Sequence, residues 1–144
     1  MQDIGNARYK EQVDEMKRLA DLNTCMFCPD GLSIVNKKIL HTGTYWFVSP
    51  NEYPYEGTSV HVMIIPKRHV EEITSLTIEE LGELTTMISW VNENFSIKGA
   101  TLFCRYGDTR YTSGTIKHLH LHIAQGEEKA TSSKKITATI GFYE

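Results

Sequence analysis

HLHLHIA, residues 118–124, decides the fold class, because histidine and an aliphatic residue alternate along it without a break. Successive side chains of a β-strand point to opposite faces. The pattern therefore predicts a strand over residues 117–124, with Leu119, Leu121 and Ile123 in the core. The three imidazoles would share the other face, with successive Cα atoms roughly 7 Å apart, close enough to act on one substrate.

Outward from this stretch, the sequence predicts an α+β fold with a mainly antiparallel sheet of about five strands. Thr77 and Glu80 have the spacing of a capping box, and apolar residues recur every three to four positions after them. They predict a long helix over 78–95 that covers one face of the sheet. An amphipathic helix over 6–22 is expected to pack through Tyr9, Val13, Met16 and Ala20. Extended segments are expected at 32–36, 39–49, 60–66, 101–106, 117–124 and 136–142, and loops at 25–31, 50–57 and 107–115.

The chain length and composition indicate one domain over residues 1–144, with a helical extension at 1–22, a core at 25–124 and a strand at 136–142. The net charge of −3 argues against broad nucleic-acid binding. The longest apolar run, Val62 to Ile65, is too short for a membrane span, and the charged first 20 residues do not fit a signal peptide. We therefore expect a cytoplasmic protein without membrane association.

Two of the three cysteines form a CxxC pair, Cys25 and Cys28. An odd number of cysteines in a chain without a leader favours reduced thiols that bind metal or act in redox chemistry. Two thiolates and two imidazoles would complete a tetrahedral, closed and hence structural zinc site. We expect Cys104 to be a small core residue.

The histidines outside the alternating stretch separate into different settings. His61 opens a predicted strand and His69 follows its end, so the two lie roughly 25 Å apart in an extended chain and should serve different sites. His41, beside a predicted turn, has no such context. The imidazoles of 118–124 fit two chemistries. They could hold a zinc ion with an open position, or one of them could attack a phosphorus atom while another stabilises charge there.

Several motifs together resemble the histidine-triad superfamily of nucleotide hydrolases and transferases. They appear in the family's order between residue 25 and about residue 124: CMFC at 25–28, NEYPY at 51–55, HVMIIPKRH at 61–69, the capped helix and HLHLHIA. The set is most similar to the zinc-containing branch near bacterial diadenosine tetraphosphate phosphorylases, and more distantly to galactose-1-phosphate uridylyltransferase. The resemblance implies the corresponding α+β fold and a homodimer whose sheet continues across two subunits.

The resemblance also implies a reaction. His120 would attack the α-phosphorus of a dinucleoside polyphosphate or nucleoside phosphoramidate, and water or phosphate would resolve the nucleotidyl-histidine. His122 and His61 would flank the phosphate. Transferases of the superfamily carry glutamine in place of the third histidine, so His122 favours hydrolysis or phosphorolysis. By the same resemblance, the zinc ligands would be Cys25, Cys28, His69 and His118.

Substrate-binding residues follow from the same resemblance. Asn51 matches a position near the ribose, and Phe47 and Ile64 are candidates for the base pocket. Before the triad, residues 104–115 lack the family's Asn, Gly and Gly-Gln-Ser pattern. Thr115 can still offer a hydroxyl, and Arg105 or Arg110 can supply positive charge to a phosphate.

Two other hypotheses stay open at this point. One is a metallohydrolase with catalytic zinc on His118, His120 and His122. The other is a nucleotide sensor that binds in the same pocket without turnover.

Overall fold

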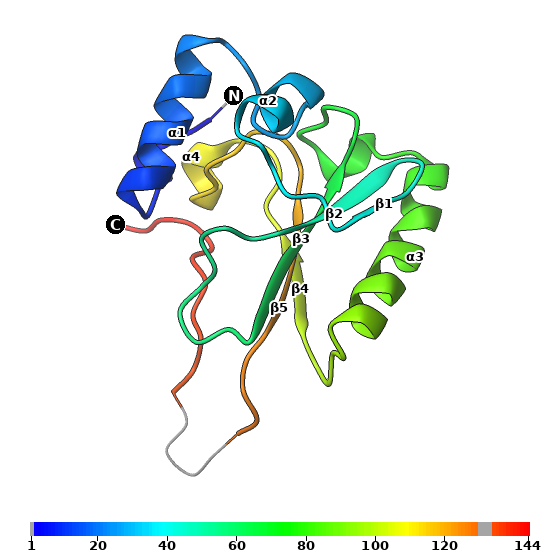
Figure 1. Cartoon of the computed structure of the whole chain (residues 1–144). Helices are drawn as coiled ribbons and strands as arrows, with labels where there is room; N and C mark the ends of the chain where they lie inside the picture. Colours follow the sequence, from blue (N-terminus) through cyan, green and yellow to red (C-terminus); the bar gives the residue numbers. More distant parts are fainter. Residues whose placement is uncertain (1, 130–133) are drawn as a thin grey trace.

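A computed structural model describes residues 2–129 and 134–144, and its centre is a five-stranded antiparallel sheet (Figure 1). The strand order is β1-β2-β3-β5-β4, and every neighbouring pair is antiparallel. The α+β class predicted from the sequence is confirmed. The strands are β1 (His41–Thr42), β2 (Trp46–Pro50), β3 (Val60–Pro66), β4 (Thr101–Cys104) and β5 (Leu121–Gln125). The helices are α1 (Lys10–Asp21), α2 (Pro29–Ile34), α3 (Ile78–Asn94) and α4 (Thr109–Thr112), with short 3₁₀ turns η1 (Ile4–Asn6) and η2 (Ile73–Ser75).

The two faces of the sheet carry separate hydrophobic clusters. On one face, α3 packs against a core that includes Val62, Ile64 and Ile123. The opposite face contacts the N-terminal helices through a second cluster that includes Met63 and Ile65. Figure 1 shows α1 and α2 on the side of the sheet away from α3. The alternation along β3 thus divides its side chains between the two cores.

The long helix α3 begins where the sequence indicates. The Thr77 side chain accepts a hydrogen bond from the Glu80 backbone N–H at 3.1 Å, and the Glu80 carboxylate accepts one from the Thr77 N–H at 3.3 Å. This reciprocal capping box satisfies two backbone donors that the first turn leaves free. Among the residues that the structure describes, no helix is long and apolar enough to cross a membrane.

The turn predicted over 25–31 is present at the CxxC pair, where the Cys28 N–H donates to the Cys25 carbonyl at 3.3 Å. From Pro29 onward the segment is helical, so the turn at 29–31 and the strand predicted over 32–36 are wrong. Pro29 occupies the first helical position, where its fixed φ and missing N–H are tolerated. Gly31 packs so tightly that a Cβ there would collide with the Cys25 carbonyl oxygen. A hairpin forms further along the chain, between β1 and β2.

The N-terminal helix is shorter and rotated relative to the prediction. It begins at Lys10 and buries Gln12, Met16 and Leu19, while Tyr9 and Ala20 are exposed. Ahead of it, residues 2–8, here called the N-terminal segment, follow the loop that leads to the histidines. They are fixed there by backbone and side-chain hydrogen bonds to that loop: Asp3 N–H to Thr115 O at 2.6 Å, and Asn6 Nδ2 to Gly114 O at 2.7 Å.

The C-terminal strand predicted over 136–142 is also wrong, since this described segment is irregular and runs back beside the sheet (Figure 1). Side chains of Arg105 and Ser113 hold this segment through hydrogen bonds to Thr139. Arg105 Nη2 donates to the Thr139 carbonyl at 2.6 Å, and the Ser113 and Thr139 hydroxyls are 2.8 Å apart. Ile140, one of the apolar residues that suggested a strand, is 87% exposed and covers no sheet face.

Candidate active site and metal centre

The alternating histidines lie where β5 begins, and the strand is shorter than predicted. It starts at Leu121, so only His122 of the three lies within it. Leu119, Leu121 and Ile123 are buried in the core beneath α3. The three imidazoles do not form one row. The His118 ring contacts the cysteines, whereas the His120 and His122 rings are neighbours with centroids 5.0 Å apart.

Four side chains form a compact group that could hold a metal ion: Cys25, Cys28, His69 and His118. One ligand atom from each lies within 4.8 Å of all the others. The Nδ1 of His118 is 3.5 Å from Cys25 Sγ and 3.6 Å from Cys28 Sγ, and the Nδ1 of His69 is 3.4 Å from Cys28 Sγ. Zinc bonds of about 2.3 Å to sulfur and 2.0–2.1 Å to nitrogen place S and N about 3.5 Å apart in a tetrahedron. The separations fit such a site.

The second nitrogen of each imidazole in this group already has a partner. His118 Nε2 lies 2.7 Å from the Pro66 carbonyl oxygen, and His69 Nε2 lies 3.1 Å from a carboxylate oxygen of Glu71. A carbonyl and a carboxylate can only accept, so each Nε2 carries the proton and each Nδ1 keeps its lone pair for a metal. Burial and the adjacent Cys25 raise the pKa of Cys28 to about 12, a cost that a bound cation removes by stabilising the thiolates.

A second group of imidazoles has different hydrogen bonds. The Tyr55 backbone N–H donates to His61 Nδ1 at 3.1 Å, which places the His61 proton on Nε2. His61 Nε2 lies 2.9 Å from His122 Nδ1, so it donates there and the His122 proton lies on Nε2. That Nε2 is buried and has no partner among the described residues. A hydrogen-bond donor is therefore available at His122.

His120 has the opposite tautomer. Its Nδ1 lies 2.8 Å from the His118 carbonyl oxygen, which can only accept, so Nδ1 carries the proton. The Nε2 lone pair is left free. Burial lowers the pKa of His120 to about 4, so the ring is neutral at physiological pH. Burial likewise lowers the pKa of His61 to about 4 and that of His122 well below its ordinary value.

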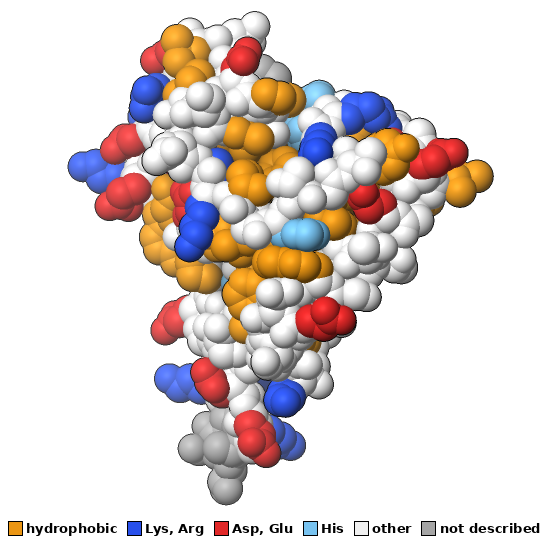
Figure 2. All heavy atoms as spheres, turned by 45° about the vertical axis from the view of Figure 1, so that its right-hand side comes forward, with side chains coloured by type: hydrophobic (Ala, Val, Ile, Leu, Met, Phe, Trp, Pro, Cys, Tyr) orange, Lys and Arg blue, Asp and Glu red, His pale blue; other side chains and the backbone are white. Residues whose placement is uncertain are grey.

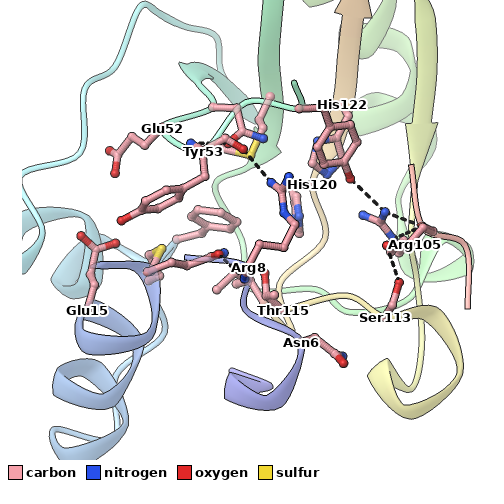
Figure 3. A pocket seen from close by; sticks show the side chains of 18 of the residues that line it. Asn6, Arg8, Glu15, Glu52, Tyr53, Arg105, Ser113, Thr115, His120 and His122 are labelled. Atoms are coloured by element: carbon pink, nitrogen blue, oxygen red, sulfur yellow. Dashed lines mark hydrogen bonds between the residues drawn. The ribbon is translucent and has the colours of Figure 1, made fainter. Parts of the chain in front are cut away.

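A cavity of about 300 Å³ opens beside His120 and His122, and its wall comes from distant parts of the chain (Figure 3). The N-terminal segment and α1 supply polar side chains, the loop after β2 supplies tyrosines, and residues 105–116 close another side. Apolar walls come from Met26, Phe27 and Met63. Polar and aromatic residues that also line the cavity are Arg8, Glu15, Lys37, Asn51, Glu52, Tyr53, Tyr55, Arg105 and Thr115.

Three of the substrate-contact candidates from the sequence line this cavity: Asn51, Arg105 and Thr115. The Asn51 Oδ1 accepts from the Tyr53 backbone N–H at 2.9 Å. Its Nδ2 lies 3.1 Å from His61 Nε2, a packing contact and not a hydrogen bond, because both nitrogens carry protons in the tautomer that the Tyr55 N–H fixes. His61 is buried behind this contact and reaches the cavity through His122.

Three other candidates lie elsewhere, and these predictions are corrected. Phe47 is buried in the second hydrophobic cluster and borders a separate apolar hollow beside α2. Ile64 points to the core under α3. Arg110 extends into solvent and forms an ion pair with Asp108, with Nη2 and Oδ2 2.6 Å apart. An apolar residue on a strand is compatible with either face, and only the register of the sheet decides which one.

The residues that the sequence prediction missed come mainly from the N-terminus and from residues 51–55 after β2, here called the tyrosine loop. Arg8 and Glu15 belong to segments that have no recognisable site pattern. The NEYPY motif was recognised, but only its asparagine was assigned. Tyr55 contacts the imidazoles directly, with its ring centroid 4.8 Å from that of His61 and 6.2 Å from that of His122.

The residues left unassigned also have structural places. His41 stacks on Trp90 with centroids 4.6 Å apart and 6° between the planes. Cys104 packs partly buried against the core beneath α3. On the face shown in Figure 2, hydrophobic side chains and histidine lie among interspersed basic and acidic ones, without a continuous basic stripe.

The antiparallel α+β fold, the imidazole pair at the cavity and the nearby Cys/His cluster agree with the resemblance to the histidine-triad superfamily. The HIT domain family model matches residues 56–129, slightly more than half of the chain. The chain therefore belongs to the HIT domain family.

Sequence relatives and solved structures agree with this family. An uncharacterized HIT-like protein of Helicobacter pylori is 31% identical over 71 residues, which span 48% of this chain and 66% of the relative. The match thus covers just under two thirds of that relative's length. A HIT family hydrolase from Clostridium thermocellum has a similar fold, with 24% identity, a TM-score of 0.57 and coverage of 78% of this chain and 96% of its own.

Two further structures carry more specific names. The C. elegans NitFhit protein is 27% identical, with a TM-score of 0.51, over 62% of this chain and 22% of its own. A diadenosine triphosphate hydrolase of Plasmodium falciparum has 20% identity and a TM-score of 0.50 over 66% of this chain and 65% of its own. The latter likeness shows the fold.

Proposed function

We propose that this protein is a nucleotide hydrolase or phosphorylase that cleaves its substrate at the α-phosphorus through a nucleotidyl-His120 intermediate. The substrate is a dinucleoside polyphosphate or a nucleoside phosphoramidate. The observation that carries the proposal is the opposite protonation of two neighbouring imidazoles at the cavity. His120 offers a lone pair, and His122 offers an N–H donor.

In the first step, the His120 Nε2 lone pair forms a bond to the α-phosphorus. The bond from phosphorus to the leaving group breaks, and the leaving group takes the bonding pair. The His122 Nε2–H donates to a phosphoryl oxygen, whose negative charge needs stabilisation in the transition state. The His118 carbonyl fixes the His120 ring during this step.

In the second step, an oxygen of water or inorganic phosphate attacks phosphorus from the cavity. The N–P bond breaks and its electron pair returns to His120 Nε2, while the proton of an attacking water passes to solvent. Two displacements at lower barriers replace one difficult displacement. His61 holds the His122 tautomer, and the Tyr55 backbone N–H holds that of His61. The proposed roles of Asn51 and Thr115 are hydrogen bonds to the substrate.

We also propose that Cys25, Cys28, His69 and His118 hold a structural zinc ion. Bound zinc would link α2 to the start of β5 and so fix the backbone from which His120 projects. Its four protein ligands leave no open position for substrate. Catalytic zinc on His118, His120 and His122 is disfavoured, because His118 Nδ1 points to the cysteines and His122 Nδ1 is bonded to His61.

The organisation of the chain is part of the proposal. We propose one HIT domain in which residues 2–22 are an extension that completes the cavity. A homodimer would form by pairing of β4, which lies at the edge of the sheet and exposes 48% of Leu102. Light scattering of the wild type and Leu102→Lys tests it. A monomeric wild type contradicts the dimer.

The reaction is tested by trapping the intermediate. Protein mixed with α-³²P-labelled diadenosine triphosphate, diadenosine tetraphosphate or adenosine phosphoramidate is quenched in alkali, where a phosphohistidine-type bond survives. We expect acid-labile label on the wild type and none on His120→Ala, with His41→Ala as a labelled control. Nucleotide binding without label or turnover for all three compounds would support the sensor hypothesis instead.

A further inference from the structure

Arg8, which lies outside the residues that the family model matches, reaches the reaction site from the N-terminal segment. This segment is fixed to the loop before the histidines by the hydrogen bonds of Asp3 and Asn6 and by an isolated bridge between Gln2 and Ile116. The Arg8 backbone N–H donates to Gln12 Oε1 at 3.0 Å, which joins the segment to α1. The position of Arg8 is thus built by contacts along the whole segment.

The guanidinium of Arg8 is held over the cavity by the tyrosine loop. Its Nη2 donates to the Tyr53 carbonyl at 2.6 Å, and its Cζ lies 4.5 Å from the centre of the Tyr55 ring. Figure 3 shows Arg8 in the same cavity as His120 and His122. Its other N–H groups have no hydrogen-bond partner among the residues that the structure describes, so they are available to a ligand.

Tyr55 places a second guanidinium beside the same imidazoles. Arg105 Nη2 donates to the Tyr55 hydroxyl at 2.9 Å, while Arg8 lies over the ring. Neither arginine forms an ion pair with a carboxylate among the described residues, whereas Lys37, the third cation of the cavity, is paired with Glu52 at 3.4 Å. Two positive charges therefore face the site without an acidic partner.

His61 and His122 add no positive charge, because burial keeps both imidazoles neutral at pH 7 and each accepts a hydrogen bond on Nδ1. A phosphoryl group between two esters or amides carries about one negative charge. Two guanidiniums without a carboxylate partner match a ligand with more charge than that, and arginine binds phosphate oxygens through several N–H groups at once.

We propose that Arg8 is a specificity-determining residue that binds a second phosphate, next to the one attacked by His120, so that the site selects nucleoside di- and polyphosphate derivatives over phosphoramidates. This inference rests on the proposed function. It also makes the N-terminal extension part of the substrate site. Arg105, bonded to the Tyr55 hydroxyl, contributes the second positive charge.

The test compares Arg8→Gln with Arg110→Gln, which removes the same charge from an arginine paired with Asp108 outside the cavity. Calorimetry measures binding of AMP and ADP, which differ by one phosphate. We expect the wild type and Arg110→Gln to prefer ADP by about tenfold or more, as a charge-assisted hydrogen bond provides. Arg8→Gln should bind the two about equally, and Arg8→Lys should restore part of the preference.

Kinetics give a second readout. For Arg8→Gln, kcat/KM should fall about tenfold or more for diadenosine triphosphate and less than about threefold for adenosine phosphoramidate. Equal losses for both substrates, an unchanged ADP preference in Arg8→Gln, or no nucleotide binding by the wild type would overturn the inference. If the wild type turns over none of these compounds, the proposed function fails, while the ratio of ADP to AMP affinity still decides the role of Arg8.

Discussion

Two imidazole clusters lie at opposite ends of β3, and they differ in what remains free after their hydrogen bonds are formed. In the Cys/His cluster, His69 and His118 use Nε2 for a carboxylate and a carbonyl, and both Nδ1 atoms face the thiols. At the cavity, His120 and His122 use Nδ1, and their Nε2 atoms remain for a ligand. The same side chain is thus prepared for a metal or for phosphorus by the partner of its other nitrogen.

The difference also explains why histidines two residues apart can have separate roles. His118 is followed by an irregular step before β5 begins, and its carbonyl receives the His120 Nδ1–H while its ring contacts the cysteines. A metal at one cluster would therefore stiffen the backbone that orients the other. We expect substitution of His120 to remove activity with the metal retained, whereas substitution of a metal ligand acts on activity only through this backbone.

The largest effect is expected from His120→Ala. Removal of a nucleophile typically costs on the order of 10⁴-fold or more in kcat. The ring is half-buried at the cavity and donates one hydrogen bond, so the fold and the metal content should survive. Steady-state kinetics and atomic absorption on the same preparation check both statements. Activity within tenfold of the wild type would exclude the covalent mechanism.

Cys25→Ser should have its main effect on metal content and stability, the two properties that His120→Ala leaves unchanged. Loss of a zinc thiolate should reduce metal content from about one equivalent to near zero and lower the free energy of unfolding by about 3 kcal/mol or more. Thermal unfolding should shift by about 10 °C. Cys104→Ser is the matched control, because that thiol lies outside the cluster. Full metal content in Cys25→Ser would remove Cys25 from the ligand set.

The sequence was sufficient for the parts of this comparison that depend on local periodicity. β3, α3 and the burial of Leu119, Leu121 and Ile123 follow from spacing alone. α2 was missed because the sequence pattern does not show the close contact of Gly31 with the Cys25 backbone, and the three apolar residues of segment 32–36 fit a strand equally well.

The missed site residue Arg8 shows where such prediction ends. Its place depends on hydrogen bonds between residues 3–6 and 109–115, more than 100 positions away, and no local pattern signals such a pairing. Phe47 lies away from the cavity for a related reason. Alternation along a strand predicts the face on which a side chain lies, but not whether that part of the face borders the cavity. Residue type and spacing thus predicted the imidazoles, while the register and the N-terminal contacts decide what surrounds them.

A smaller effect concerns the charge of His61. Its pKa of about 4 lies below the ordinary 6.5 because of burial, so between these pH values the unfolded chain binds more protons than the folded protein. The stability associated with neutral His61 is complete above pH 6.5 and is lost as the pH falls toward 4, by about 3 kcal/mol at most. Nitrogen chemical shifts should show His61 neutral at pH 5.5 in the folded protein and largely protonated in urea. Titration near 6.5 in the folded state would contradict the His61–His122 proton arrangement.

The smallest expected effect tests the outer partner of the metal cluster. Glu71→Ala removes the carboxylate that holds the His69 Nε2–H, and such partners typically contribute 10- to 100-fold to metal affinity. Because both side chains are exposed, we expect about tenfold, measured by competition with a chromophoric chelator. Glu71→Gln keeps an acceptor oxygen and should lose less, and Glu72→Ala, an exposed neighbour without a histidine contact, should lose nothing. Turnover should change by less than about twofold in all three, since the cavity imidazoles take their orientation from the His118 carbonyl and from His61. A tenfold loss of turnover in Glu71→Ala with metal still bound would mean that the two clusters are coupled through more than the backbone of residue 118.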